Sequence, residues 1–143
     1  MSYGPSPTEA AQTYRQRQIE TADPIGLIVC VLEVACENLA KARAAIKAGE
    51  PAVKGRCIAR VSKALGLLQS SLDMSQGEIS KNLDRLYIYM QQRVSFGHLH
   101  NDDEALKEVA EHLSEMTAAW RTAAEQQPGV PAPAAQTAVA AAR

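Results

Sequence analysis

The sequence is poor in aromatic residues, which fill only 4% of its 143 positions. A core made from this chain must therefore consist of Leu, Ile, Val and Ala, and an alanine-rich chain with few rings favours helices. The sequence also has no excess of positive charge, because its formal net charge is −1. A surface that follows nucleic-acid phosphates needs clustered Lys and Arg. Nucleic acid is therefore a poor candidate partner.

Long apolar runs are also missing. No stretch approaches the ~18 successive apolar residues that a membrane-spanning helix needs, and residues 1–5 lack the basic patch that opens a signal peptide. Cys30, Cys36 and Cys57 have no Cys-x-x-Cys spacing and lie within apolar helical patterns. This placement is typical of small packing residues rather than of disulfide partners. We expect a cytoplasmic protein that does not insert into membranes.

The apolar residues that are present recur at alternating steps of three and four, which is the period of an amphipathic helix. Asp23 and Pro24 suit the N-cap and the first position of the first such helix. Gly49 and Pro51 suit its end. The apolar stripe of this helix consists of Ile25, Ile28, Leu32, Ala35, Leu39, Ala42 and Ile46.

The same periodicity predicts three more helices. The second runs from about residue 51 to residue 72. The third follows Ser75-Gln76-Gly77-Glu78, which has the form of a capping box, and is expected to end near Gly97. A polar turn then leads to Asn101, which offers an N-cap for the fourth helix because a Glu lies three residues later.

Four amphipathic helices with short connections imply antiparallel neighbours in a four-helix bundle. We therefore predict an all-α chain in three parts. Residues 1–22 form a mobile leading segment with a short polar helix, and residues 23–126 form the bundle domain. Residues 127–143 are rich in Pro and Ala, have too little apolar bulk to fold against a core, and are predicted to be a disordered tail.

No catalytic pattern stands out. His98, His100 and Asp102, together with Asp103, are the only cluster of potential metal ligands, and no other element supplies a partner with ligand spacing. We interpret this cluster as a solvated turn, with a metal enzyme as the alternative. Neither a Gly-x-Ser-x-Gly turn nor a glycine-rich phosphate loop occurs. We expect no enzyme and no cofactor.

The first and third helices carry more apolar residues than one stripe can hold. The first has Leu27, Val29 and Val31 beside its stripe, and the third has Tyr87 and Ile88. Either these helices are surrounded by neighbours, or part of their surface forms a groove that receives an amphipathic helix of a partner. Periodicity leaves both alternatives open.

Several segments together match the pattern of a known family. They are Tyr14, Thr21-Ala22-Asp23-Pro24, Leu72-Asp73, Gly77-Glu78-Ile79-Ser80-Lys81-Asn82-Leu83, Leu86-Tyr87-Ile88-Tyr89-Met90 and Trp120. Over residues 14 to 124 the sequence resembles the flagellar secretion chaperones that guard flagellin. It departs from their pattern at Leu32-Glu33-Val34-Ala35, where the family usually has Leu-Tyr-Asp-Gly.

The resemblance implies a cytoplasmic chaperone that binds the disordered C-terminal region of flagellin and prevents premature polymerisation. Flagellin would then be delivered to the gate of the flagellar type III export system. The alternative is a homodimeric helical-bundle adaptor or regulator for another secreted substrate. On the first interpretation, grooves beside the first and third helices hold the client, and Tyr14 covers one of them. The predicted partner-binding residues are Tyr14, Ile28, Val31, Leu32, Ile79, Leu83, Leu86 and Tyr87.

Overall fold

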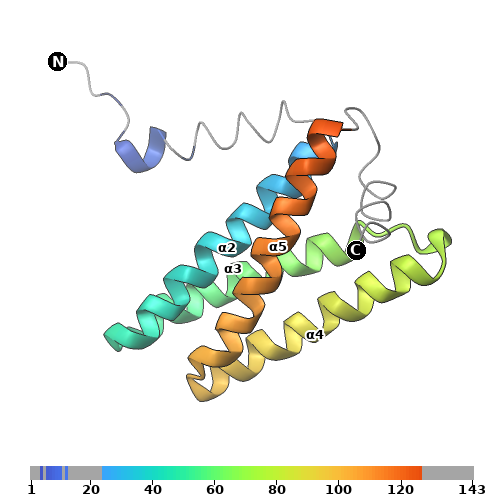
Figure 1. The fold of residues 1–143 in the computed structure, drawn as a ribbon. Helices are drawn as coiled ribbons and strands as arrows, with labels where there is room; N and C mark the ends of the chain where they lie inside the picture. Colours follow the sequence, from blue (N-terminus) through green and yellow to red (C-terminus); the bar gives the residue numbers. More distant parts are fainter. Residues whose placement is uncertain (1–3, 5, 11, 13–23, 127–143) are drawn as a thin grey trace.

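The computed structural model describes residues 4, 6–10, 12 and 24–126. Four long helices lie in this part of the chain, with a short 3-10 turn, η1 (Met74–Gln76), before the third of them. Successive long helices run antiparallel, and the first and third each pack against both the second and the fourth (Figure 1). The predicted all-helical bundle is therefore confirmed. The helices are α2 (Pro24–Ala48), α3 (Pro51–Ser70), α4 (Glu78–His100) and α5 (Asp103–Gln126).

The boundary between α2 and α3 follows the sequence signals. Gly49 has a φ of 69°, the left-handed conformation that glycine adopts without strain, and it ends α2. Pro51 occupies the first turn of α3, where its missing N–H costs nothing. The predicted cap at Asp23 and most of the predicted leading segment lie outside the described residues, as does the predicted tail.

The predicted capping box between Ser75 and Glu78 is wrong. Asp73 does the capping instead, because its Oδ1 accepts a hydrogen bond from the backbone N–H of Ser75 at 3.0 Å and starts η1. Gly77 then turns the chain with a φ of 78°, and no side chain caps α4. The 3-10 turn thus takes up the residues that the box would need, so Ser75 lies too far from the start of α4 to cap it.

The third helix does not end near Gly97, as the sequence suggests, but continues to His100. Gly97 instead permits close packing between helices. A Cβ atom added there would lie 2.6 Å from Cδ2 of Leu106 and 3.1 Å from the backbone oxygen of Asp102. This glycine lets the start of α5 approach α4 more closely than any other residue would allow.

A buried lysine holds the turn between α4 and α5. Lys54 of α3 is only 9% exposed, and its Nζ donates to the backbone oxygen of His98 at 3.0 Å and to Oδ1 of Asn101 at 2.6 Å. Asn101 has a φ of 51° and ends α4 rather than capping α5, which corrects the predicted cap. Asp102 caps α5 instead, accepting from the backbone N–H of Ala105 at 3.2 Å.

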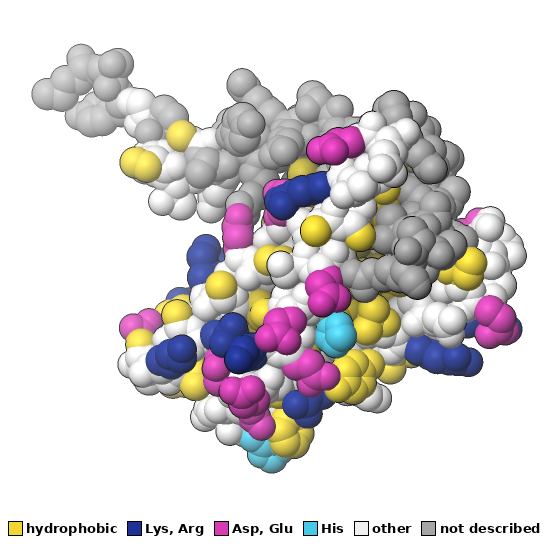
Figure 2. Space-filling view, viewed as in Figure 1, with side chains coloured by type: hydrophobic (Ala, Val, Ile, Leu, Met, Phe, Trp, Pro, Cys, Tyr) yellow, Lys and Arg dark blue, Asp and Glu magenta, His cyan; other side chains and the backbone are white. Residues whose placement is uncertain are grey.

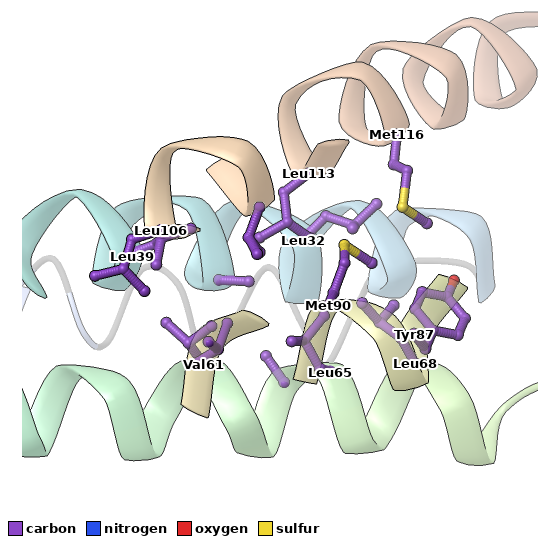
Figure 3. Close-up of a cluster of buried hydrophobic side chains, with 14 of the residues drawn as sticks. Leu32, Leu39, Val61, Leu65, Leu68, Tyr87, Met90, Leu106, Leu113 and Met116 are labelled. Atoms are coloured by element: carbon purple, nitrogen blue, oxygen red, sulfur yellow. The ribbon is translucent and has the colours of Figure 1, made fainter. Parts of the chain in front are cut away.

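The core lies between the four helices and receives large side chains from each of them (Figure 3). Burying one such aliphatic side chain contributes about 1.5–3 kcal/mol, so this cluster dominates the stability of the bundle. Fully buried examples are Leu32 and Leu39 from α2, Val61 and Leu65 from α3, Tyr87 and Met90 from α4, and Leu106 and Leu113 from α5.

We expect Gly97→Ala to destabilise the bundle by about 1–3 kcal/mol, the usual cost of forcing an extra group into a packed core. Urea denaturation measures the free energy of unfolding. Gly66→Ala is the matched control, because nothing lies within 4 Å of its added Cβ. The control should be stabilised by about 0.5–1 kcal/mol through the better helix propensity of Ala. Equal stability of the two variants would contradict the role assigned to Gly97.

Candidate partner-binding surface

An apolar groove runs along the outer side of the bundle between α2 and α3. Its volume is about 240 Å³, which is below the ~300 Å³ of typical small-molecule pockets. The space suits one or two aliphatic side chains of a polypeptide better than a metabolite. We call it the α2–α3 groove, and it is lined by Cys30, Val31 and Val34 of α2 and Arg60, Lys63, Ala64 and Leu67 of α3.

Helical spacing places these residues on the flanks of the two helices. Val31 and Val34 lie three positions apart and to one side of the buried stripe of α2 that contains Leu32. On α3, Ala64 and Leu67 are likewise three positions apart, and Leu67 is 52% exposed. Ala64 is buried at the floor of the groove, Val31 and Val34 are half-buried, and Leu67 is left exposed because α2 and α3 bury their other flanks against α5 and α4.

A polar pocket continues from the α2–α3 groove and shares Val34 and Arg60 with it. Asn38 lies in this pocket and is only 4% exposed. Its Nδ2 donates to the backbone oxygen of Val34 at 2.9 Å, while its Oδ1 has no hydrogen-bond partner among the described residues. The pocket is lined by Thr8, Gln12, Val34, Glu37, Asn38, Lys41 and Arg60.

The opposite flank of α2, which faces α5, is polar. Arg121 of α5 pairs with Glu33 at 2.7 Å, so the residue that stands where the flagellar family usually has Tyr forms an ion pair. The Sγ of Cys36 lies 3.8 Å from Oγ1 of Thr117. Burial raises the pKa of the Cys36 thiol above its usual value, and the contact with Thr117 offsets only part of this rise. A protonated, half-buried thiol is a poor nucleophile, and we assign this flank no chemistry.

The outward face of α4 carries exposed apolar and aromatic side chains. Ile88, Tyr89 and Phe96 are each about 40% exposed, and Leu99 is 76% exposed. The guanidinium of Arg93 lies 5.2 Å from the centre of the Phe96 ring. We call these four exposed side chains the α4 stripe. It is separate from the α2–α3 groove, because α4 contacts α3 and α5 but lies diagonally across the bundle from α2.

Acidic side chains follow α5 on the face that Figure 2 shows. Glu108 connects this helix to α4, because it accepts hydrogen bonds from the Tyr89 hydroxyl and, at 3.0 Å, from Nε of Arg93. The hydrogen bond from Tyr89, followed by that from Arg93, lowers the pKa of Glu108 despite partial desolvation. This end of the bundle is therefore held by charge-assisted contacts as well as by packing.

The structure divides the predicted partner-binding residues into three groups. Val31 lines the α2–α3 groove. Ile79, Leu83 and Leu86 are half-buried on α4, and Leu83 and Leu86 pack against the core. The third group consists of Ile28, Leu32 and Tyr87. Their side chains are fully or almost fully buried, which does not fit the prediction that they line an open groove. Tyr14 lies outside the described residues.

These three residues are buried because they belong to the face of their helix that points into the bundle. Sequence periodicity identified that face but not the open flank beside it. Val34 and Leu67, which line the groove, were not predicted as site residues. Their signal is an apolar residue three or four positions from a buried one, Leu67 from Ala64 and Val34 from Cys30, in a helix that already has a complete stripe.

Three of the four candidate metal ligands have other roles. Asp102 caps α5, Asp103 pairs with Arg43 at 2.8 Å, and the His100 ring packs 4.5 Å from that of Phe96. Within the described residues, no group of three or more His, Cys, Asp or Glu is placed to hold a metal ion. The described helices also include none with the length and apolar character to cross a membrane.

A family described as flagellar protein FliS matches residues 7–127, which include all of the bundle. The chain belongs to the FliS family. Flagellar secretion chaperone FliSB of Pseudomonas aeruginosa is 35% identical over 117 residues, covering 78% of this chain and 93% of that protein. The resemblance seen in the sequence is therefore confirmed at the level of the family.

Two further relatives have similar names. Flagellar secretion chaperone FliS of Vibrio cholerae is 35% identical over 107 residues, covering 72% of this chain and 76% of the relative. Flagellar secretion chaperone FliS of Salmonella typhimurium is 34% identical over 116 residues, covering 78% and 84%. This member of the family thus shares a bundle-length similarity with each of them.

The lowered pKa of Glu108 predicts a specific acid sensitivity. A carboxylate with a depressed folded-state pKa stabilises the fold above its unfolded pKa of about 4.3, and this stabilisation is lost as the pH falls through the folded value. We expect Glu108→Gln to be less stable than the wild type at pH 7 and to lose less thermal stability on acidification. Glu111→Gln on the same helix, a residue without an ion pair among the described residues, should follow the wild type. Melting curves of the three proteins from neutral pH to about pH 3 test this.

Proposed function

We propose that this chain is a cytoplasmic chaperone that binds the disordered C-terminal region of flagellin. Binding prevents premature polymerisation and assists export by the flagellar type III secretion system. The observation that carries the proposal is the exposed apolar α2–α3 groove on a member of the FliS family. The names of its relatives, which are flagellar secretion chaperones, support the role in secretion.

The groove has the shape for helix-in-groove recognition. An amphipathic client helix presents anchors at steps of three, four and seven residues, and the pairs Val31 with Val34 and Ala64 with Leu67 have a matching spacing. One or two buried anchors contribute about 1.5–3 kcal/mol each. Ordering a disordered segment costs about 2–5 kcal/mol. The α2–α3 groove alone therefore gives little net affinity, and the client needs further contacts.

Half-buried residues of α4 are the proposed second contact, namely Ile79, Leu83 and Leu86. An extended client can reach both sites by wrapping around the bundle. In this arrangement Ile28, Leu32 and Tyr87 support the binding surfaces from beneath. Tyr14 is proposed to cover the groove before the client arrives, and Thr8 and Gln12 of the same leading segment already line the adjoining pocket.

The decisive experiment is calorimetric titration of the chain with a flagellin C-terminal fragment. We expect the wild type to bind with a negative heat-capacity change, the mark of apolar burial. Leu67→Glu should weaken binding at least about tenfold, because it places a charge in the apolar groove. Its effect on folding should be small, since Leu67 is half exposed.

Leu99→Glu is the matched control for this experiment. Leu99 is also an exposed leucine, but it lies on the α4 stripe. The control variant should bind the fragment as tightly as the wild type does. Absence of binding by the wild type at every temperature would refute the proposed function, and equal weakening by both variants would refute the assignment of the groove.

A homodimeric adaptor for another secreted substrate is the second candidate. The observation that favours it is the α4 stripe, since exposed apolar patches often mark contacts between proteins. A dimer formed through this stripe would leave the α2–α3 groove open for a substrate. Separating the two candidates therefore requires two measurements, the oligomeric state of the chain and the identity of its client.

We expect the wild-type chain to sediment as a monomer of 15.4 kDa, because Gln92 interrupts the stripe and Arg85 flanks its start on the same face of α4. Sedimentation velocity over a range of concentrations measures this. A dimer that does not dissociate on dilution, that excess flagellin fragment leaves intact and that Leu99→Glu disrupts would favour the adaptor instead.

A further inference from the structure

Basic side chains form the rim of the α2–α3 groove. Arg60 and Lys63 lie beside its apolar floor, and Arg60 also lines the adjoining pocket together with Lys41. None of the three forms an ion pair with a carboxylate of the described residues. Other basic residues of the bundle do form such pairs, namely Arg43, Lys81, Arg93 and Arg121. Among the described residues no carboxylate therefore lies within ion-pair distance of these three basic side chains, although Glu37 also lines the adjoining pocket.

The whole of α3 has the same character. It contains Lys54, Arg56, Arg60 and Lys63 but no Asp or Glu, although the chain as a whole has a net charge of −1. Like charges along one helix repel each other, and a partner of opposite charge relieves that repulsion. Complementary charge also accelerates association and excludes partners of the wrong sign.

The adjoining pocket contains a buried hydrogen-bond acceptor, Oδ1 of Asn38, that has no donor among the described residues. A carbonyl oxygen can only accept hydrogen bonds, so the contact with the Val34 carbonyl fixes the amide of Asn38 with its NH₂ group toward Val34. Its Oδ1 therefore points elsewhere, and among the described residues no donor reaches it. A buried acceptor without a donor is costly, so a partner that supplies one gains affinity.

We propose that the α2–α3 groove selects an amphipathic helix whose apolar stripe is flanked by acidic side chains. Arg60 and Lys63 pair with those carboxylates, and Asn38 accepts a hydrogen bond from a donor of the same segment. The proposal rests on the proposed function, in which an exported client occupies this groove. It adds the chemistry by which the client is recognised.

Two other occupants fit the charge less well. The leading segment, residues 1–22, contains Arg15 and Arg17 but also Glu9 and Glu20, so its side chains bring no net negative charge to balance the positive rim. A second copy of the chain in a two-fold symmetric contact through the groove would place Arg60 and Lys63 of both copies against each other. An acidic client helix meets neither obstacle.

The charge requirement is tested with two synthetic amphipathic peptides of equal length and identical apolar stripe. One carries Glu on both sides of the stripe, and the other carries Lys. We expect the Glu peptide to bind the full chain at least about tenfold more tightly at low salt, consistent with two ion pairs. This preference should disappear in the double variant R60Q/K63Q and should shrink at high salt.

The double variant K47Q/R56Q is the matched control. It removes the same charge from exposed positions of α2 and α3 that do not line the groove, and it should keep the preference. Equal binding of the two peptides by the wild type, or equal loss in both double variants, would overturn the proposal. Peptide binding could instead be abolished by deletion of residues 1–22 and by neither double variant. That result would assign the surface to the leading segment and would also overturn the proposal.

The same variants, titrated with the flagellin fragment, separate this proposal from the proposed function. Weaker binding by R60Q/K63Q, by about tenfold, supports both. Wild-type affinity in R60Q/K63Q, combined with loss of binding in Leu67→Glu, overturns the charge requirement and leaves the proposed function intact. No binding by the wild type refutes the proposed function, while the peptide pair still decides whether the groove selects acidic helices.

The role of Asn38 is tested by Asn38→Leu, a change that keeps the size of the side chain. For this test the Glu peptide carries Gln at one position beside the stripe as the donor, and we expect the variant to bind it about fivefold more weakly, the loss of roughly one hydrogen bond. Its melting temperature should be unchanged or higher, because an unpaired buried oxygen is removed. A purely structural asparagine would instead show a lower melting temperature with unchanged affinity, and that result would overturn the assignment.

Discussion

The packing of α2 against both α3 and α5 is the constraint on which the surface of this bundle depends. Because both flanks of α2 lie beside a neighbouring helix, its outer side chains determine the character of two adjoining surfaces. Toward α5 those side chains include Glu33, which pairs with Arg121. Toward α3 they are Val31 and Val34, which remain apolar beside Leu67. One helix thus separates a polar flank from an apolar one.

Most of the fold could be predicted from the sequence, because a buried helical face requires apolar residues at steps of three and four. The end of α4 could not. A glycine that permits close packing, such as Gly97, looks in a sequence the same as one that ends a helix. The contact that explains it comes from Leu106, which lies on the next helix. The capping roles of Asp73 and Asp102 likewise depended on turn geometry that short sequence patterns do not specify.

The candidate site was predictable only in part. The sequence showed that α2 carries surplus apolar residues, and one of them, Val31, lines the α2–α3 groove. It did not show which members of the surplus face the core, because that depends on where the neighbouring helices lie. Ile28 and Leu32 are therefore buried, whereas Leu67 of α3 is exposed. The basic rim at Arg60, and the Asn38 oxygen that has no donor among the described residues, both depend on how α2 and α3 lie side by side.

The small size of the α2–α3 groove has a consequence for how long a bound segment stays. A space of about 240 Å³ accepts only one or two side chains at a time, so the attachment of a long segment is divided among several weak contacts. Such contacts can open one after another, and no single step then has a high kinetic barrier. If the groove holds a client as proposed, a segment bound in this way can be pulled off from one end by a modest force.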